Sequence, residues 1–199
     1  KTDENGGTAT FTVRLASKPS DDVTITLTSS DSGEGEVLSD NLSFSTENWN
    51  ADQLVRVRGV DDNESDGDQS YRIVLGADNT TADTSGYKGL DPSDVVLQNT
   101  DDDSAGFNVS SVSRDTEEYG QTALFSIWLR SQPSDNVTLS FTSSDEGEGR
   151  VSPLSWTFTS TNWNSAKDVT ITGQPDNISD GDQSYAVIIT GDNETTDAR

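Results

Sequence analysis

The chain contains two acidic loops whose residue types and spacing suit a hard divalent cation. Residues 61–68 read DDNESDGD and residues 175–182 read PDNISDGD, so three aspartates recur at an offset of 114 residues. Calcium takes about six to eight oxygen ligands at roughly 2.3–2.6 Å, and carboxylates in loops supply them. Magnesium demands tighter octahedral geometry and is less favoured. The chain has no histidine and no cysteine, which argues against a zinc site.

Further carboxylates recur at the same offset. Glu4 and Glu118 each precede a strongly alternating segment, and Glu34 and Glu148 occupy matched GEG turns. Three consecutive aspartates, Asp101–Asp103, close the first copy. The recurrent acidic residues, which are candidate metal ligands, are Glu4, Glu34, Asp62, Asp66 and Asp68 in the first copy and Glu118, Glu148, Asp176, Asp180 and Asp182 in the second.

Two other interpretations of the acidic loops are an EF-hand loop and a solvated surface. An EF-hand loop has a closing acidic residue and helical flanks, whereas residues 61–68 have neither. A solvated surface held by Asx-turns is the simpler alternative. The recurrence of the same aspartates in both copies disfavours that alternative without excluding it.

The elements that must position these carboxylates are repeated as well. Trp49 and Trp163 lie in matched NWN turns, again 114 residues apart, and this period is the size of one domain. We therefore predict one domain over residues 1–103 and a second over residues 104–199. A segment like 106–118 does not precede the first copy, and one like 86–103 does not follow the second. We expect the first domain to lack its first strand and the second to lack its last.

Period-two alternation of apolar and polar residues predicts the secondary structure. The segment ATFTVRLAS places Ala9, Phe11, Val13 and Leu15 on one face, and its counterpart from Ala123 repeats the pattern. No segment shows a helical stripe of apolar residues. Short strands with one buried face, separated by Ser, Asp, Asn and Gly, favour antiparallel sheets. The predicted fold class is all-β, as two tandem immunoglobulin-like antiparallel β-sandwiches of about seven strands each.

Charge and composition exclude several classes of function. The chain has 12 Lys and Arg against 36 Asp and Glu, for a formal net charge of −24. Nucleic acid is an unsuitable partner because phosphate binding needs clustered basic residues. Without histidine there is no Ser–His–Asp triad, and no GxxxxGK loop is present, so we expect no enzyme. No apolar run approaches the roughly 20 residues that span a bilayer.

The tryptophans allow two interpretations. Trp49 and Trp163 suit a structural cap on the end of each sandwich, with the flanking asparagines holding the turn. A platform for stacking a sugar is the alternative, although neither has a second aromatic residue nearby in sequence. Alternation places Trp128 on the outward face of its strand, and a single exposed aromatic residue needs no special explanation.

The order of these features resembles the Calx-β domain. A glutamate precedes a strand of the form GxxxFxVxL, an Asp-Asp loop precedes an aromatic strand, and a terminal Asp-Asp-Asp follows. The resemblance implies an immunoglobulin-like sandwich with calcium ions clustered at one end. It implies as ligands Glu4, Asp61, Asp62, Asp66, Asp101, Asp102 and Asp103 in the first domain, with Glu34 as a looser match, and Glu118, Asp176 and Asp180 in the second.

The sequence departs from that family pattern at several positions. SGEGEV and EGEGRV replace the family's glycine-aspartate-tyrosine segment after the second strand, and Gln69 and Gln183 stand where the family has glutamate. Pro175 replaces the equivalent of Asp61, and no second acidic triplet follows the second copy. We therefore expect the second calcium site to be incomplete.

The resemblance implies a calcium-binding structural or adhesive module of a large secreted, extracellular or cell-surface protein. Calcium is expected to stiffen the junction between the domains. The expected partners are neighbouring repeats of the same parent chain and a glycan or protein ligand at the cell surface, without direct membrane insertion. Two alternatives stay open, namely a carbohydrate- or protein-binding module that uses its loops and tryptophans, and a calcium-sensing regulatory domain.

Overall fold

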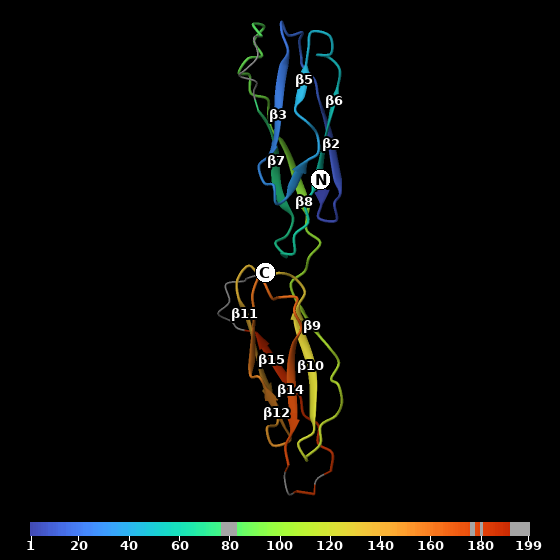
Figure 1. Ribbon diagram of the computed structural model, residues 1–199, viewed down its shortest axis with the longest axis vertical. Helices are drawn as coiled ribbons and strands as arrows, with labels where there is room; N and C mark the ends of the chain where they lie inside the picture. The colour runs from blue at the N-terminus through green and yellow to red at the C-terminus, as the bar shows by residue number, and fades with distance from the viewer. Residues whose placement is uncertain (77–82, 176–177, 180, 192–199) are drawn as a thin grey trace. The chain divides into compact units, whose positions relative to one another are not determined.

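The chain forms two compact units built from β-strands (Figure 1). The computed structural model describes residues 1–76, 83–175, 178–179 and 181–191. Unit 1 comprises Lys1–Asp62 and Asp66–Asp102, and unit 2 comprises Asn63–Ser65 and Asp103–Arg199. Every regular element in the described ranges is a strand, which confirms the all-β prediction.

Unit 1 is a sandwich of two sheets. The strands in chain order are β1 (Thr2–Asp3), β2 (Thr8–Val13), β3 (Val23–Ser29), β4 (Gly35–Val37), β5 (Leu42–Phe44), β6 (Gln53–Gly59), β7 (Gln69–Gly76) and β8 (Val95–Thr100). One sheet has the order β1-β8-β7-β3-β5, and the other has the order β2-β6-β4. All the pairs are antiparallel except β1 with β8, which is parallel.

Alternation of side chains places the core of unit 1 between these sheets. In β6, Val55 and Val57 are fully buried, while Leu54, Arg56 and Arg58 between them face solvent. The remaining buried apolar residues of this core are Leu15, Val23, Ile25, Leu27, Leu42, Phe44, Tyr71, Ile73 and Leu75. The inward faces that period two predicts are therefore confirmed for these strands.

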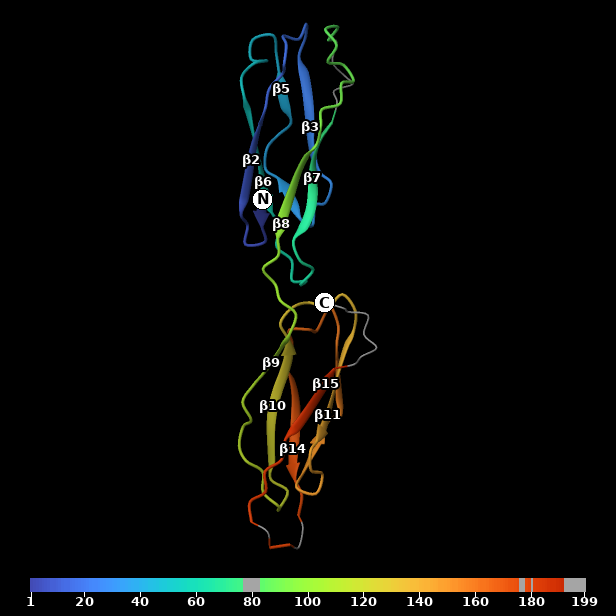
Figure 2. The same cartoon turned by 180° about the vertical axis from the view of Figure 1, so that it is seen from behind.

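Unit 2 repeats this arrangement except at the sheet edges, where its described strands include no counterpart of β1 or β8 and one further strand, β9, pairs with β10. Its strands are β9 (Phe107–Val109), β10 (Thr122–Leu129), β11 (Val137–Ser143), β12 (Gly149–Ser152), β13 (Ser155–Phe158), β14 (Lys167–Gly173) and β15 (Val187–Gly191). The two sheets have the orders β12-β14-β10-β9 and β13-β11-β15. Figure 2 shows β15 crossing beside β11. In the described part of unit 2, no strand takes the position that β8 has in unit 1.

The tryptophan of each NWN turn contacts the core of its own unit, and backbone hydrogen bonds hold the turn. Trp49 and Trp163 pack against the cores of their own units. Their backbone oxygens accept hydrogen bonds from Leu15 N and Leu129 N, each at 2.9 Å. The asparagine before each tryptophan holds the turn. In unit 2, for example, Asn162 Oδ1 accepts a hydrogen bond from Thr159 N at 2.8 Å. These contacts favour the cap interpretation over an exposed stacking platform.

Candidate metal site

Parallel pairing of β1 with β8 brings the first residues of unit 1 beside the acidic triplet. Thr2 lies opposite Asn99 and Asp3 lies opposite Thr100, and the Glu4 backbone N–H donates to Thr100 O at 3.1 Å. The ladder thus delivers Glu4 to the point where β8 ends and the aspartates begin. Gly59 permits this approach, because a Cβ there would overlap the backbone oxygen of Asp3.

Three carboxylates converge at this end of β8. One carboxylate oxygen from each of Glu4, Asp101 and Asp103 lies within 4.8 Å of the other two. Glu4 is only 2% exposed, and Asp101 and Asp103 are half-buried. The backbone N–H of Asp102 donates to Glu4 Oε2 at 3.3 Å. Three oxygens this close suit a single cation of the size and hardness of calcium.

Burial makes the ionised form of Glu4 unfavourable. Loss of solvation is the largest effect and raises the pKa of Glu4 from its ordinary 4.5 to about 7. The hydrogen bond from Asp102 N acts in the opposite direction. The negative charges of Asp62, Asp101 and Glu34 raise the pKa further. A bound divalent cation would reverse this unfavourable electrostatic environment.

Glu34 is a second buried carboxylate near the same end of the unit. It is 8% exposed, and Asn99 Nδ2 donates to its Oε2 at 3.3 Å and to Val60 O at 2.9 Å. Burial raises the pKa of Glu34, the Asn99 hydrogen bond lowers it, and the charges of Asp66, Asp62 and Asp31 raise it. Glu34 is therefore held in place by a neutral amide and faces other carboxylates.

The loop over residues 61–68 is tied to the acidic triplet. The backbone N–H of Gly67 donates to Asp101 Oδ2 at 2.7 Å, and Gly67 has φ +78°, a conformation that favours glycine. Gln69 Nε2 donates to Asp66 O at 3.0 Å, so this glutamine supports the loop backbone. Asp62 and Asp66 are half-buried and contribute negative charge to this end of the unit.

The other predicted residues of unit 1 lie differently. Asp61 and Asp102 are exposed, and Asp102 contributes its backbone N–H to Glu4. Asp68 is exposed and forms a salt bridge with Lys1 Nζ at 3.4 Å. The structure therefore brings together Glu4, Asp101 and Asp103. The charges of Asp62 and Glu34 raise the pKa of Glu4, and the charges of Asp66 and Asp62 raise the pKa of Glu34.

In unit 2 the corresponding carboxylates do not form such a group. Glu118 and Asp182 are exposed and Glu148 is half-buried. Asp176 and Asp180 lie outside the described residues. Within the part of unit 2 that the structure describes, no three carboxylates meet as they do in unit 1. The strand β8, which leads into the triplet, has no counterpart in those residues.

Sequence reasoning missed the residues that support the site. Asn99 is 1% exposed and holds Glu34, while Thr2 Oγ1 and the Tyr71 hydroxyl share a hydrogen bond of 2.9 Å under β1. The alternation of inward and outward residues could have identified Asn99, because it shares the inward face of β8 with Val95 and Leu97. A polar residue on a buried face needs partners for its hydrogen bonds.

Comparisons with known proteins give low similarity. No protein-family model matches the chain, and no curated protein matches it. The calcium binding domain CBD12 of CALX1.1 matches with 20% identity and a TM-score of 0.40, over 95% of this chain and 76% of that one. CBD12 of CALX1.2 matches with 18% identity and a TM-score of 0.36, over 86% and 70%.

A further solved structure matches over a small part of its own length. Dimeric latent PorU from Porphyromonas gingivalis has 12% identity and a TM-score of 0.25, over 96% of this chain and 18% of that one. At these levels of similarity, the residues of the chain itself have to indicate its function.

Proposed function

We propose that calcium binds after the end of β8 through Glu4, Asp101 and Asp103, the last of which directly follows unit 1 in the sequence, with Asp62, Asp66 and Glu34 completing the acidic environment. The observation that supports this most strongly is the burial of the Glu4 carboxylate against two other carboxylates. A buried carboxylate without a compensating charge is unfavourable, whereas a calcium ion would supply that charge and accept the oxygens as ligands.

The residues present fit such an ion. The three carboxylates offer oxygen ligands from the residue after β1 and from the segment that follows β8. Backbone hydrogen bonds from Asp102 N and Gly67 N hold the Glu4 and Asp101 carboxylates in place. Calcium would link the 61–68 loop to the triplet at 101–103, which lies in the sequence between the two units.

We further propose that this ion has a structural purpose, in a module that serves a larger extracellular or surface-attached assembly. Tandem copies, the absence of cysteine and a net charge of −24 support this role. Neighbouring repeats and a glycan or protein at a cell surface are the proposed partners. Among the described residues there is no helix with the length and apolarity to cross a bilayer.

The test is calorimetric titration of the whole chain with calcium, repeated with magnesium. The double variant Asp101→Asn, Asp103→Asn removes two negative ligands, and we expect its calcium affinity to fall at least tenfold. Asp40→Asn is the matched control, because Asp40 is an exposed aspartate in the turn between β4 and β5. Equal calcium heats from all three proteins would refute the proposed site.

A further inference from the structure

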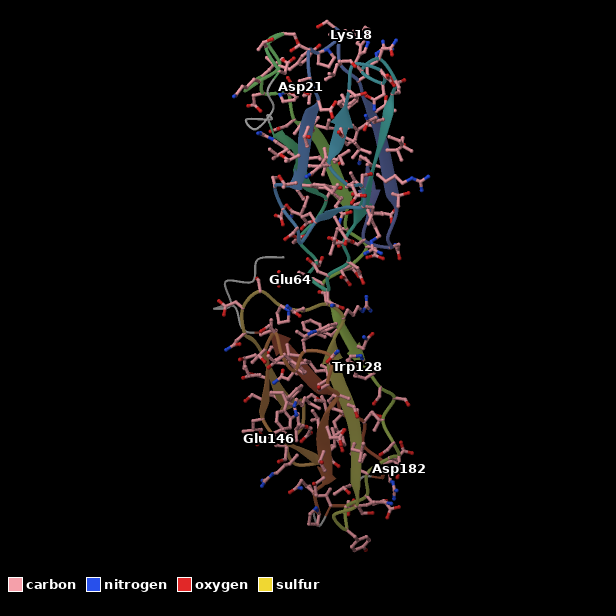
Figure 3. The ribbon with its side chains drawn as sticks, turned by 45° about the horizontal axis from the view of Figure 1, so that its top comes forward. Lys18, Asp21, Glu64, Trp128, Glu146 and Asp182 are labelled. Carbon is pink, nitrogen blue, oxygen red and sulfur yellow. The ribbon has the colours of Figure 1, made fainter. Side chains whose placement is uncertain are left out.

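Asn5 and Gly6 lie in the turn between β1 and β2 of unit 1, and they are the one Asn-Gly pair in the chain. Asn5 is exposed. Gly6 has φ +83°, a conformation that favours glycine, and no atom of the described residues lies within 4 Å of the place that a Cβ would take. From this turn, β2 leads to the loop with Lys18 and Asp21, which Figure 3 labels at the other end of unit 1. The turn therefore lies at the end of unit 1 that carries the candidate metal site.

An asparagine that precedes a glycine can lose ammonia without an enzyme. The backbone nitrogen of the glycine gives up its proton and attacks Cγ of the asparagine. A new bond from Cγ to that nitrogen forms, the bond from Cγ to Nδ2 breaks, and ammonia leaves. Water then opens the resulting succinimide ring at one of its two carbonyls and gives aspartate or isoaspartate. Glycine favours ring closure because it has no Cβ beside the attacking nitrogen.

Hydrogen bonds hold the two sides of this turn and leave its middle accessible. Gly7 N donates to Asp3 Oδ1 at 2.9 Å, and Gly59 N donates to Gly7 O at 2.9 Å. Gly6 N donates to Asp3 O at 3.1 Å, within a single turn at the surface. Such a bond opens at little cost in free energy, so Gly6 N is available for attack. The ring forms between the held residues, and the fold does not have to open for it.

The loop over residues 61–68 contains a comparable pair that the structure protects. Asp66-Gly67 would close the same ring with loss of water, but Gly67 N donates to Asp101 Oδ2 at 2.7 Å. A hydrogen bond to a carboxylate is strong, and this one must break before Gly67 N attacks. We therefore expect Asp66 to keep its normal peptide link. In unit 2, Tyr119 takes the position of Asn5 at the 114-residue offset, so the matching turn has no asparagine.

We propose that Asn5 is a site of spontaneous deamidation through a succinimide with Gly6, and that the new carboxylate strengthens calcium binding at the neighbouring site. The first statement depends on the turn alone. The second rests on the proposed function, because it needs an ion at Glu4, Asp101 and Asp103. A neutral side chain next to Glu4 in the sequence becomes an anion, which should raise the affinity for a divalent cation by about two- to fivefold.

Mass spectrometry of the tryptic fragment 2–14, released by cleavage after Lys1 and Arg14, tests the modification. The full chain is kept at pH 8 in chelator beside a peptide of residues 1–10, KTDENGGTAT, which has the same pair without the folded turn. We expect the fragment to gain the mass that replacement of NH2 by OH adds, at a rate within about tenfold of the peptide. A rate below that range would overturn the proposed modification.

Asn50 is the internal control for the modification, because it is exposed but precedes alanine. Its fragment should keep its mass over the same period. Loss of ammonia from Asn50 at the rate seen for Asn5 would also overturn the proposal, since the Asn-Gly turn would then have no special part in the reaction.

Two aspartate variants test the effect on calcium. Asn5→Asp reproduces one product, whereas Asn50→Asp adds the same charge before β6, which runs from that end of unit 1 to Gly59 beside Asp3. The seven residues of β6 span about 20 Å, roughly twice the screening length at an ionic strength of about 0.1 M. In calorimetric titration, we expect Asn5→Asp to bind calcium about two- to fivefold more tightly than the wild type, and Asn50→Asp to match the wild type. Equal affinities of the two variants would refute the effect on calcium.

The two measurements separate failure of this inference from failure of the proposed function. If the wild type binds calcium and fragment 2–14 keeps its mass, the modification is wrong and the calcium site remains. If the fragment gains mass and neither the wild type nor Asn5→Asp binds calcium, the proposed function is wrong, the effect on calcium is wrong with it, and the modification remains.

Discussion

We expect replacement of Glu4 by glutamine to change the stability of unit 1 in opposite directions with and without calcium. Glutamine keeps an oxygen that accepts from Asp102 N, but it has no negative charge to bury beside Asp101 and Asp103. In chelator the substitution removes an unfavourable charge. In calcium it removes a ligand. We therefore expect Glu4→Gln to raise the free energy of unfolding of unit 1 in chelator and to lower it in calcium.

The pKa of Glu4 gives the size of the effect in chelator. Burial and neighbouring negative charges raise it from 4.5 to about 7, and each pKa unit corresponds to about 1.4 kcal/mol. Between these pH values the folded state holds a proton that the unfolded state has lost. The contribution of Glu4 to stability is therefore fully present below pH 4.5 and falls by about 3 kcal/mol as the pH rises past 7. At pH 8 in chelator, Glu4→Gln is expected to be more stable than the wild type by up to about 3 kcal/mol.

The pH dependence supplies an internal check. Near pH 4.5 the wild-type carboxyl is protonated, so wild type and Glu4→Gln should have similar stability. A smaller dependence of the same sign should remain in the variant, because burial also raises the pKa of Glu34. At pH 8 the order should reverse with calcium at about 1,000 times its dissociation constant, because the ion then stabilises the wild type by roughly 4.1 kcal/mol, which exceeds the cost of the buried charge.

The assay must report on unit 1 alone. Three of the four tryptophans are in unit 2, so urea unfolding is better followed by hydrogen exchange of the β7 amides. Glu118→Gln is the matched control, because Glu118 is the exposed equivalent of Glu4, and it should change stability by less than about 0.5 kcal/mol. If Glu4→Gln destabilises unit 1 at pH 8 in chelator, the electrostatic reasoning is wrong.

Three further predictions test the supports of the site and its effect on the chain. Asn99→Ala leaves Glu34 and Val60 O without their buried donor and should destabilise unit 1 by roughly 1–3 kcal/mol in urea unfolding, whereas no change would remove its supporting role. Gly59→Ala forces β1 away from β6 and should weaken calcium binding in calorimetry, while Gly191→Ala, where a Cβ meets no atom within 4 Å, should not. Small-angle scattering should show a narrower range of chain dimensions in calcium than in chelator, and indistinguishable profiles would contradict stiffening of the 101–103 segment.

The strands and their buried faces were predictable from the sequence, because parity alone determines which side chains share a face. Val55 and Val57 are examples, since the alternation with Arg56 and Arg58 places both valines on the same inward face of β6. Parity does not give the order of strands in a sheet. The parallel pairing of β1 with β8 joins segments almost a whole domain apart, and no local pattern signals it.

The candidate site was also predictable only in part. Repetition identified Glu4 and Glu118 as equivalent, yet one is buried and the other exposed, because burial depends on the strand that lies beside each of them. Asn99 was not identified, since an asparagine in a strand is recognisable as a support only when its partner Glu34 is known. Asp61 and Asp68 were predicted as ligands but are exposed. Their acidic residue type alone does not distinguish an inward carboxylate from a solvated one.

Diffraction from crystals grown in calcium, with anomalous scattering used to locate the ion, tests the central claim most directly. We expect an anomalous peak bonded to carboxylate oxygens of Glu4, Asp101 and Asp103, at about 2.3–2.6 Å from each. A map with the three side chains in place and no peak between them at saturating calcium would contradict the account.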